Sequence, residues 1–318
     1  GDELDSGPGG LGRRGGSDLR AAPGGFLLSF FFLLPGLAGA QGLQELVQLC
    51  GQEMGGFSGR CHVAALALDA ALGGVATAGA TGTEVPGSAS TVGYRLRSAP
   101  RFALSARTGA VRYTMPDILQ GYGLPSRDRT LTIPTVQFSG VVGVLNGFSP
   151  LPTAGGVLSL DLTASAHHLF TPEEEGFRDG MWGWGVGARL GLIRESFTLP
   201  GVSLSLARRW MGSTGFGVAE IDAPAYLEFE TRVTSFRGVV GKDVMGFGLL
   251  AGAGVDRISA DGTLGVSLAP AGPEVRASGK GLESKRITYF AGISRTFLIL
   301  QLSGEVGWSE SLDPELPV

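Results

Sequence analysis

The stretch that decides the fold is LSLDLTASAH, residues 158–167, in which apolar residues hold the even positions and polar residues the odd ones. Because the side chains of a β-strand point alternately to its two faces, this pattern predicts a strand with one apolar and one polar face. The same period of two recurs in the runs that begin at Trp184, Val202, Leu227, Phe247 and Leu298. Several runs reach the roughly nine residues with which a tilted strand crosses a bilayer, whereas strands of water-soluble proteins average about five or six.

Nine candidate strands are found in this way. They span residues 101–113, 132–146, 156–169, 182–194, 201–210, 226–240, 245–257, 286–296 and 298–309. The piece Leu264–Ala269 is either a tenth strand or the hairpin of a long loop. Because single-chain bacterial barrels have an even number of strands, we expect about ten strands, with roughly eight to twelve allowed.

The predicted connections are unequal in length. Long ones are expected at 114–130, 170–181, 211–225 and 269–285, and short turns at 148–155, 195–201 and 241–246. Long connections on one side and short ones on the other are typical of a transmembrane barrel. The expected fold class is therefore all-β: a transmembrane antiparallel up-and-down β-barrel over residues 99–310, followed by a tail at 311–318. The alternative is a water-soluble lipocalin-like barrel or β-sandwich.

The composition agrees with this class and excludes others. Of the 318 residues, 54 are glycine and only 17% are charged, which makes the chain too apolar for intrinsic disorder. The formal net charge of −4 provides no basic field for nucleic acid, so we expect no nucleic-acid partner. Glycines on the predicted lumen face let neighbouring side chains lie across the strands.

The amino end has the order of a secretory signal peptide. Arg13, Arg14 and Arg20 precede an apolar core at residues 26–35, and small residues at 36–40 precede Gln41. Export signals share this order of a basic segment, an apolar core and small residues at the cleavage site. We expect residues 1–40 to comprise an upstream extension and a signal peptide that is removed near Ala40.

Residues 41–98 are expected to form a short helical segment. Apolar residues at 43, 46 and 47 have helical spacing, and residues 63–72 form an Ala/Leu-rich helix that Gly73-Gly74 should stop. Cys50 and Cys61, the only cysteines, flank a glycine-rich loop, which in an oxidising compartment predicts a disulfide. The hairpin is either a periplasmic cap or a plug that enters the barrel.

Residues 41–309 resemble porin-like β-barrel proteins of the Gram-negative outer membrane. Chains of that class often close with a strand that ends in an aromatic residue, which the assembly machinery reads, and residues 301–308, ending at Trp308, resemble that signal. Residues 70–76 and 86–90 resemble the amino-terminal region of the long-chain fatty-acid transporter family. The resemblance implies an outer-membrane location, with membrane lipid and the barrel-assembly machinery as partners.

The alternation also assigns candidate site residues. The charged residues predicted to point inward and line the lumen are Asp161, Arg189, Arg209, Glu228, Glu230, Arg232 and Glu305. The aromatic residues predicted to form a girdle near strand ends are Trp182, Trp184, Trp210, Tyr226, Tyr289 and Trp308. The residues predicted to face lipid include Leu160, Leu190, Leu204, Phe229 and Leu300.

We expect no cofactor, no metal site and no enzymatic activity. His167 and His168, followed by Glu173–Glu175, lack the ligand spacing of a metal site. The enzyme alternative is a hydrolase, because Asp161, Ser165 and His167 share the lumen face of one strand and make a serial triad conceivable.

The expected function is the passage or binding of small solutes, or a structural role in the envelope. A barrel of about ten strands is nearer to a closed or small-ligand barrel than to the wide water channels. The alternatives are a transporter of hydrophobic, fatty-acid-type substrates and an outer-membrane lipid hydrolase.

Overall fold

The computed structural model describes residues 39–312, apart from 55–57, 93, 97–98, 121–126, 151–154, 172, 179, 218–223, 268–273 and 299. Most of the expected signal peptide and most of the expected tail therefore lie outside the described residues, and Gly39 and Ala40 belong to α1. The helices are α1 (Gly39–Met54), α2 (Ser58–Ala80) and a short 3-10 helix, η2 (Glu173–Glu175). Two short strands, β1 (Tyr94–Leu96) and β2 (Ala99–Pro100), pair with each other.

The main sheet has nine strands, each paired antiparallel with its sequence neighbour. They are β3 (Phe102–Pro116), β4 (Asp128–Leu145), β5 (Ser159–Leu169), β6 (Met181–Ile193), β7 (Gly201–Phe216), β8 (Ala225–Val244), β9 (Phe247–Ser267), β10 (Glu274–Phe297) and β11 (Leu300–Ser311). Each of the nine candidate strands corresponds to one of these, so the all-β up-and-down prediction is confirmed. The expected tenth strand is absent from the described residues, because Leu264 belongs to the end of β9.

The strands extend further than predicted at one end of the sheet. β9 has 21 residues and β10 has 24, and there both continue well beyond the predicted ranges 245–257 and 286–296. The reason is that the outward side chains there are polar, so the hydropathy pattern resembles that of a loop. At the other end, Met245 and Gly246 connect β8 to β9 with positive φ angles of 54° and 82°, the conformation of a tight hairpin turn.

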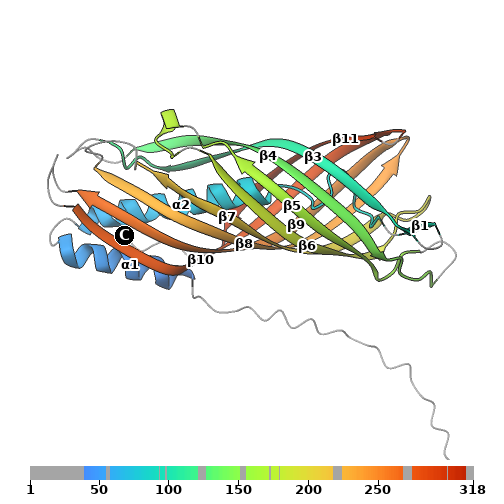
Figure 1. The fold of residues 1–318 in the computed structure, drawn as a ribbon, viewed down its shortest axis with the longest axis horizontal. Helices are drawn as coiled ribbons and strands as arrows, with labels where there is room; N and C mark the ends of the chain where they lie inside the picture. The colour runs from blue at the N-terminus through green and yellow to red at the C-terminus, as the bar shows by residue number, and fades with distance from the viewer. Residues whose placement is uncertain are drawn as a thin grey trace, which may run out of the picture. The chain divides into compact units, whose positions relative to one another are not determined.

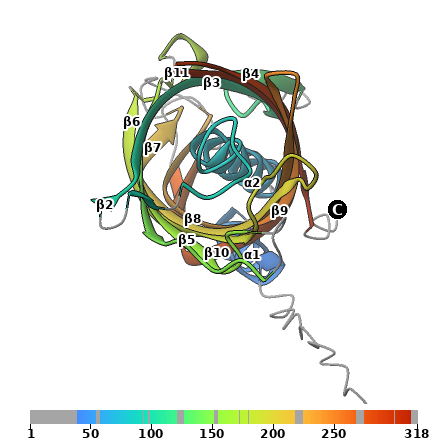
Figure 2. The ribbon, with the colours of Figure 1, turned by 90° about the vertical axis from the view of Figure 1, so that its right-hand side faces the viewer.

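The sheet curls around α2, which runs along its inside (Figures 1 and 2). The edge strands β3 and β11 run in the same direction, because nine strands alternate in direction between them. No backbone pairing joins these two edges in the described part of the chain, and their Cα atoms lie more than 8 Å apart along almost their whole length. One ion pair, between Arg107 of β3 and Glu305 of β11, connects them at 3.4 Å.

Helix α2 does not stop at Gly73-Gly74 as expected but continues to Ala80. The two glycines serve close packing instead. A Cβ atom on Gly73 would come within 2.0 Å of the Arg286 side chain, and one on Gly74 within 2.6 Å of the Tyr113 ring. Residues 59–80 are long and apolar enough to cross a membrane, but most of this helix is buried inside the sheet. Helix α2 therefore lies within the curl of the sheet, and whether it caps or plugs a barrel is part of the function proposed below.

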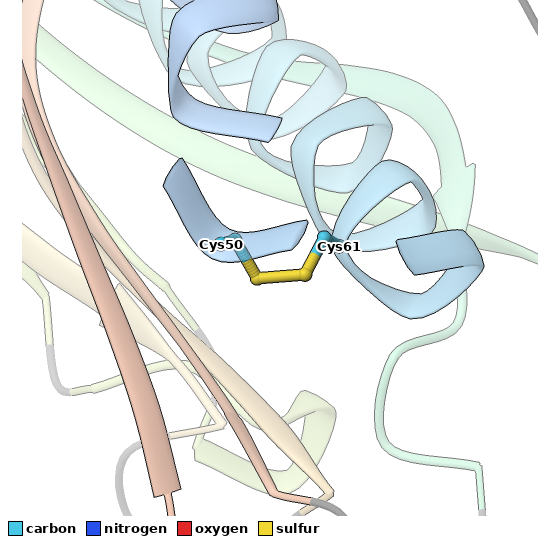
Figure 3. The surroundings of a disulfide bond; sticks show 2 residues. All are labelled: Cys50 and Cys61. Atoms are coloured by element: carbon cyan, nitrogen blue, oxygen red, sulfur yellow. A yellow bond between two sulfur atoms is a disulfide. The ribbon is translucent and has the colours of Figure 1, made fainter. Parts of the chain in front are cut away.

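A disulfide joins the end of α1 to the start of α2 (Figure 3). The Cα atoms of Cys50 and Cys61 are 5.8 Å apart and both residues are fully buried, which confirms the predicted bridge. Helix α1 packs against β10, where Leu46 of the helix meets Gly279 and Leu282 of the strand. The bridge therefore ties a helix beside the sheet to a helix within it.

The two ends of the sheet differ. We call the end with connections 117–127, 170–180, 217–224 and 268–273 the long-connection end. The other end, with connections 146–158, 194–200, 245–246 and 298–299, we call the short-turn end because it includes the two connections of two residues, although 146–158 is the longest connection of the sheet. Helix α2 begins at the long-connection end, where the Arg60 guanidinium donates a hydrogen bond to the carbonyl oxygen of Ser267. After α2, residues 81–92 continue inside the sheet toward the short-turn end, and we call them the plug segment.

Candidate functional site

The interior near the long-connection end, which we call the apolar-core half, is filled by apolar packing. Leu68, Leu72 and Val75 of α2 form one buried cluster with inward side chains from the surrounding strands. The strand members include Met115, Leu131, Ile133, Leu169, Met181, Met211, Phe216, Leu227, Phe229 and Leu264. This half is closed by the same kind of core that stabilises a water-soluble protein.

The interior near the short-turn end, which we call the polar-lumen half, holds four ion pairs around the plug segment. They are Arg107–Glu305 at 3.4 Å, Arg189–Asp161 at 2.9 Å, Arg209–Glu84 at 2.6 Å and Arg237–Asp256 at 3.3 Å. In the last three pairs every side chain is at most 5% exposed. Buried charges are tolerated when they are paired and hydrogen-bonded, and this arrangement supplies both.

Two of these arginines hold the carboxyl-terminal end of α2. Arg237 donates hydrogen bonds to the carbonyl oxygens of Ala80 and Gly82, and Arg107 donates to those of Thr81 and Thr83. The last carbonyl groups of a helix lack partners within the helix, and its dipole favours positive charge there. The guanidinium groups therefore stabilise the helix end inside the lumen.

Glu84 connects the plug segment to the opposite wall. Its carboxylate accepts a hydrogen bond from Arg209, which also donates to the Ser235 hydroxyl at 3.0 Å. Burial alone would raise the pKa of Glu84, but the positive charges of Arg209 and Arg237 outweigh it and hold this pKa below its ordinary value. The neighbouring arginines therefore favour the ionised form of Glu84.

The rest of the plug segment is attached to both edges and to the middle of the sheet. Glu305 of β11 accepts hydrogen bonds from the backbone N–H groups of Thr83, at 2.9 Å, and Gly87, at 3.1 Å. Arg189 donates to the carbonyl oxygen of Ser88, and the Asp161 carboxylate accepts from the backbone N–H of Val92. The wall thus binds the backbone of the plug segment along its length.

Four of the seven predicted lumen residues point inward: Asp161, Arg189, Arg209 and Glu305. The prediction is wrong for the three on β8. Glu228, Glu230 and Arg232 lie on the outer face and are more than two-fifths exposed, while Leu227 and Phe229 are buried against α2. The physical reason is that an apolar helix fills this part of the interior, so the apolar face of β8 turns inward there.

The residues predicted to face lipid give a similar result. Leu300 is 68% exposed, and Leu160, Leu190 and Leu204 alternate with buried inward residues, so these four lie on the outer face of the sheet. Phe229 is only 3% exposed and points inward, so its assignment to lipid is wrong for the reason given for β8.

The predicted girdle aromatics lie on the outer face. Trp182, Trp184 and Trp308 are more than half exposed, and Trp210, Tyr226 and Tyr289 are half-buried. The rings of Trp184 and Trp210 stack at 4.1 Å between their centroids, and those of Tyr289 and Trp308 at 5.7 Å. Each pair joins neighbouring strands, β6 with β7 and β10 with β11, and so adds cross-strand contact on the outer face.

Sequence reasoning missed half of the interior network: Glu84, Arg107, Arg237 and Asp256. Continuing the inward register along β8 from Val233 through Ser235 would have found Arg237. Glu84 is the only acidic residue of the plug segment, which was a weaker signal. Glycines make room for these side chains: a Cβ on Gly185 would lie 2.7 Å from Arg209, and one on Gly254 would lie 2.5 Å from Arg237.

The conceivable catalytic triad is incomplete. Ser165 and His167 are hydrogen-bonded at 2.9 Å through His Nε2, but His Nδ1 has no hydrogen-bond partner among the described residues. Asp161, the expected orienting acid, binds Arg189 and the plug segment instead. In the described ranges no three side chains of the metal-binding types gather into a cluster either.

A small pocket of about 180 Å³ opens near the start of α2. Its lining is partly apolar, with Val63, Ala64, Ile118, Ala225 and Val266, and includes Arg60 and Asp117. It is smaller than the roughly 300–1,000 Å³ of typical ligand pockets.

Neither the family models, nor the curated proteins, nor the solved structures with which the chain was compared give a match.

Proposed function

We propose that this chain is an exported β-barrel protein of a Gram-negative outer membrane, whose lumen is closed at rest by α2 and the plug segment. Small solutes bind or pass when the plug segment moves. The observation that carries this proposal is the polarity of the polar-lumen half, where charged side chains point inward and apolar ones point outward.

The outward face of the polar-lumen half is apolar on strand after strand. Its exposed members include Phe102, Leu104, Phe138, Val142, Leu162, Leu206, Phe236, Val240, Leu249, Ile293, Leu300, Leu302 and Val306. A contiguous apolar surface of this kind is unfavourable in water and is the surface that a bilayer stabilises. Closure of the sheet into a barrel is part of the proposal, and the Arg107–Glu305 ion pair between its two edges supports it.

The polar interior supports a path for solutes rather than a purely structural role. Arginine and carboxylate side chains are costly to bury, and an apolar filling would stabilise a permanently closed barrel equally well. Here the polar side chains bind one removable segment mainly through its backbone. Such bonds hold a plug in place and leave a polar wall when it withdraws.

Planar-bilayer recordings on the full chain test this proposal. The variant carrying both Arg107→Gln and Arg237→Gln removes the arginines that hold the end of α2, so we expect a higher open probability than in wild type. Arg232→Gln, on the outer face, is the matched control and should behave as wild type. A faster migration of unheated than of boiled protein on a denaturing gel shows that each variant is folded as a barrel.

Loss of the heat shift together with a water-soluble, monomeric product would overturn the membrane assignment. Folded barrels that never conduct, even in the double variant, would favour an envelope-structural role.

A hydrophobic-substrate transporter is the second candidate, favoured by the partly apolar pocket near the start of α2. Saturable binding of a fatty acid that is lost in Val63→Trp, which would fill the pocket, would support it over passage of polar solutes.

A further inference from the structure

The four ion pairs differ in where their carboxylates come from. Asp161, Asp256 and Glu305 belong to β5, β9 and β11, whereas Glu84 belongs to the plug segment. The arginines all belong to the strands. A fifth arginine, Arg286 of β10, also points inward and lies against Gly73 of α2. Among the residues described, the inward face of the strands therefore carries at least two more arginines than carboxylates.

The place occupied by Glu84 has the features of a site for a carboxylate. The Arg209 Nη2 atom lies 2.6 Å from the Glu84 Oε1 atom, and its Nη1 group donates a hydrogen bond to the Ser235 hydroxyl. Arg237 and Arg107 add positive charge from two further strands, and the Nε atoms of Arg209 and Arg237 are buried with no hydrogen-bond partner in the described part of the structure. Guanidinium groups bind carboxylates with strong, charge-assisted hydrogen bonds.

We propose that Glu84 occupies an anion-binding site on the lumen wall, and that a small carboxylate takes its place when the plug segment withdraws. The open lumen then prefers anions, as pores lined by arginine do. This inference rests on the proposed function, because it names the class of solute for the same lumen.

The overall charge of the chain would predict the opposite preference. The formal net charge is −4, and the acidic residues Glu228, Glu230 and Glu274 lie on the outer face of the apolar-core half. A lumen governed by total charge would prefer cations. Whether open events prefer anions or cations therefore distinguishes a local anion site from the effect of the net charge of the chain.

Two measurements on the full chain separate the binding site from conduction. The first is calorimetric titration of folded protein with acetate. Glu84→Gln keeps the size of the side chain but removes the negative charge that competes with acetate for Arg209. The variant should therefore bind acetate at least about tenfold more tightly than wild type does. The matched control is Glu228→Gln, which removes an outer-face carboxylate and should leave acetate binding as in wild type. Arg209→Gln added to Glu84→Gln should abolish the gain.

The second measurement is the reversal potential of open events in a KCl gradient. We expect a chloride preference of about threefold or more over potassium in wild type and in Glu84→Gln, which have the same wall arginines. Cation-preferring or unselective openings, or acetate binding that is equal in all variants, would overturn the anion site. If acetate binds as expected but no variant conducts, the passage function fails and the anion site stands. If Glu84→Gln does not fold, the ion selectivity of wild-type openings alone tests the anion site: a chloride preference supports it, and a cation preference overturns it.

Discussion

The two halves of this molecule are built from the same strands with opposite polarity. In the apolar-core half, β8 turns Leu227 and Phe229 inward against α2 and presents Glu228 to the outside. Further along the same strand, in the polar-lumen half, Arg237 points inward and Phe236 points outward. The strand keeps its alternation throughout, and what changes is which face is apolar.

This difference shows that alternation alone fixes which residues share a face but not which face is inside. The inside is decided by what fills it: an apolar helix in one half, a polar segment in the other. Polar outer residues in the apolar-core half form ion pairs on the surface, including Arg257 with Glu283 at 2.6 Å. Under the proposed membrane location, this half would extend beyond the bilayer into water, and the apolar outer face of the other half would contact lipid.

The largest effect is expected from truncating the apolar core. Phe229→Ala should lower the free energy of unfolding by about 3–5 kcal/mol, because it leaves a cavity between β8 and α2. Phe236→Ala on the outer face of the same strand is the control and should cost clearly less, since that ring is packed on one side only. Chemical denaturation in lipid vesicles measures both. Equal losses would contradict the inward position of Phe229.

The second largest effect is expected from a charge introduced on the outer face, where the two halves should differ in the stability that they lose. Leu162→Arg introduces a guanidinium between Val142 and Ala188, on the apolar outer face of the polar-lumen half. We expect it to cost about 2–4 kcal/mol in vesicles if this face meets the middle of the bilayer. Ser278→Arg, an exposed position on β10 in the apolar-core half, should cost less than about 1 kcal/mol. Similar tolerance at both positions would argue against a membrane belt.

The sequence predicted the strands, the disulfide and the inward direction of Asp161 and Arg189, because each of these follows from local pattern or from a lone pair of cysteines. It did not predict the direction of Glu228 and Glu230, because that depends on α2, which is more than 140 positions away along the chain. The sequence could not predict Glu84 as the partner of Arg209 either, because the two side chains form their ion pair only once the plug segment lies inside the sheet.

Acid should loosen the plug segment through Glu84. The pKa of this group is held below its ordinary value near 4.5, so its ionised form stabilises the folded plug above that value. The stabilisation is lost as the pH falls through the lowered pKa in the folded state. We expect open probability in planar bilayers to rise in that acid range. Glu84→Gln should already show the elevated open probability at pH 7 and lose the acid response. An unchanged acid response in that variant would show that a group other than Glu84 causes it.

The smallest effect should come from the outer ion pairs of the apolar-core half. Arg178 and Glu228 approach to 2.7 Å, but their side chains are 51% and 43% exposed. Water screens such a pair, so Glu228→Gln should change the free energy of unfolding by no more than about 1 kcal/mol. If Glu228 instead lay inside the lumen, as alternation alone suggested, removing its charge from a buried partner would cost about 3–5 kcal/mol. Chemical denaturation at low and high salt separates the two cases, because salt weakens an exposed pair and leaves a buried one almost unchanged. A large, salt-independent loss of unfolding free energy would therefore mean that Glu228 points inward. The contrast between the two halves would then be wrong.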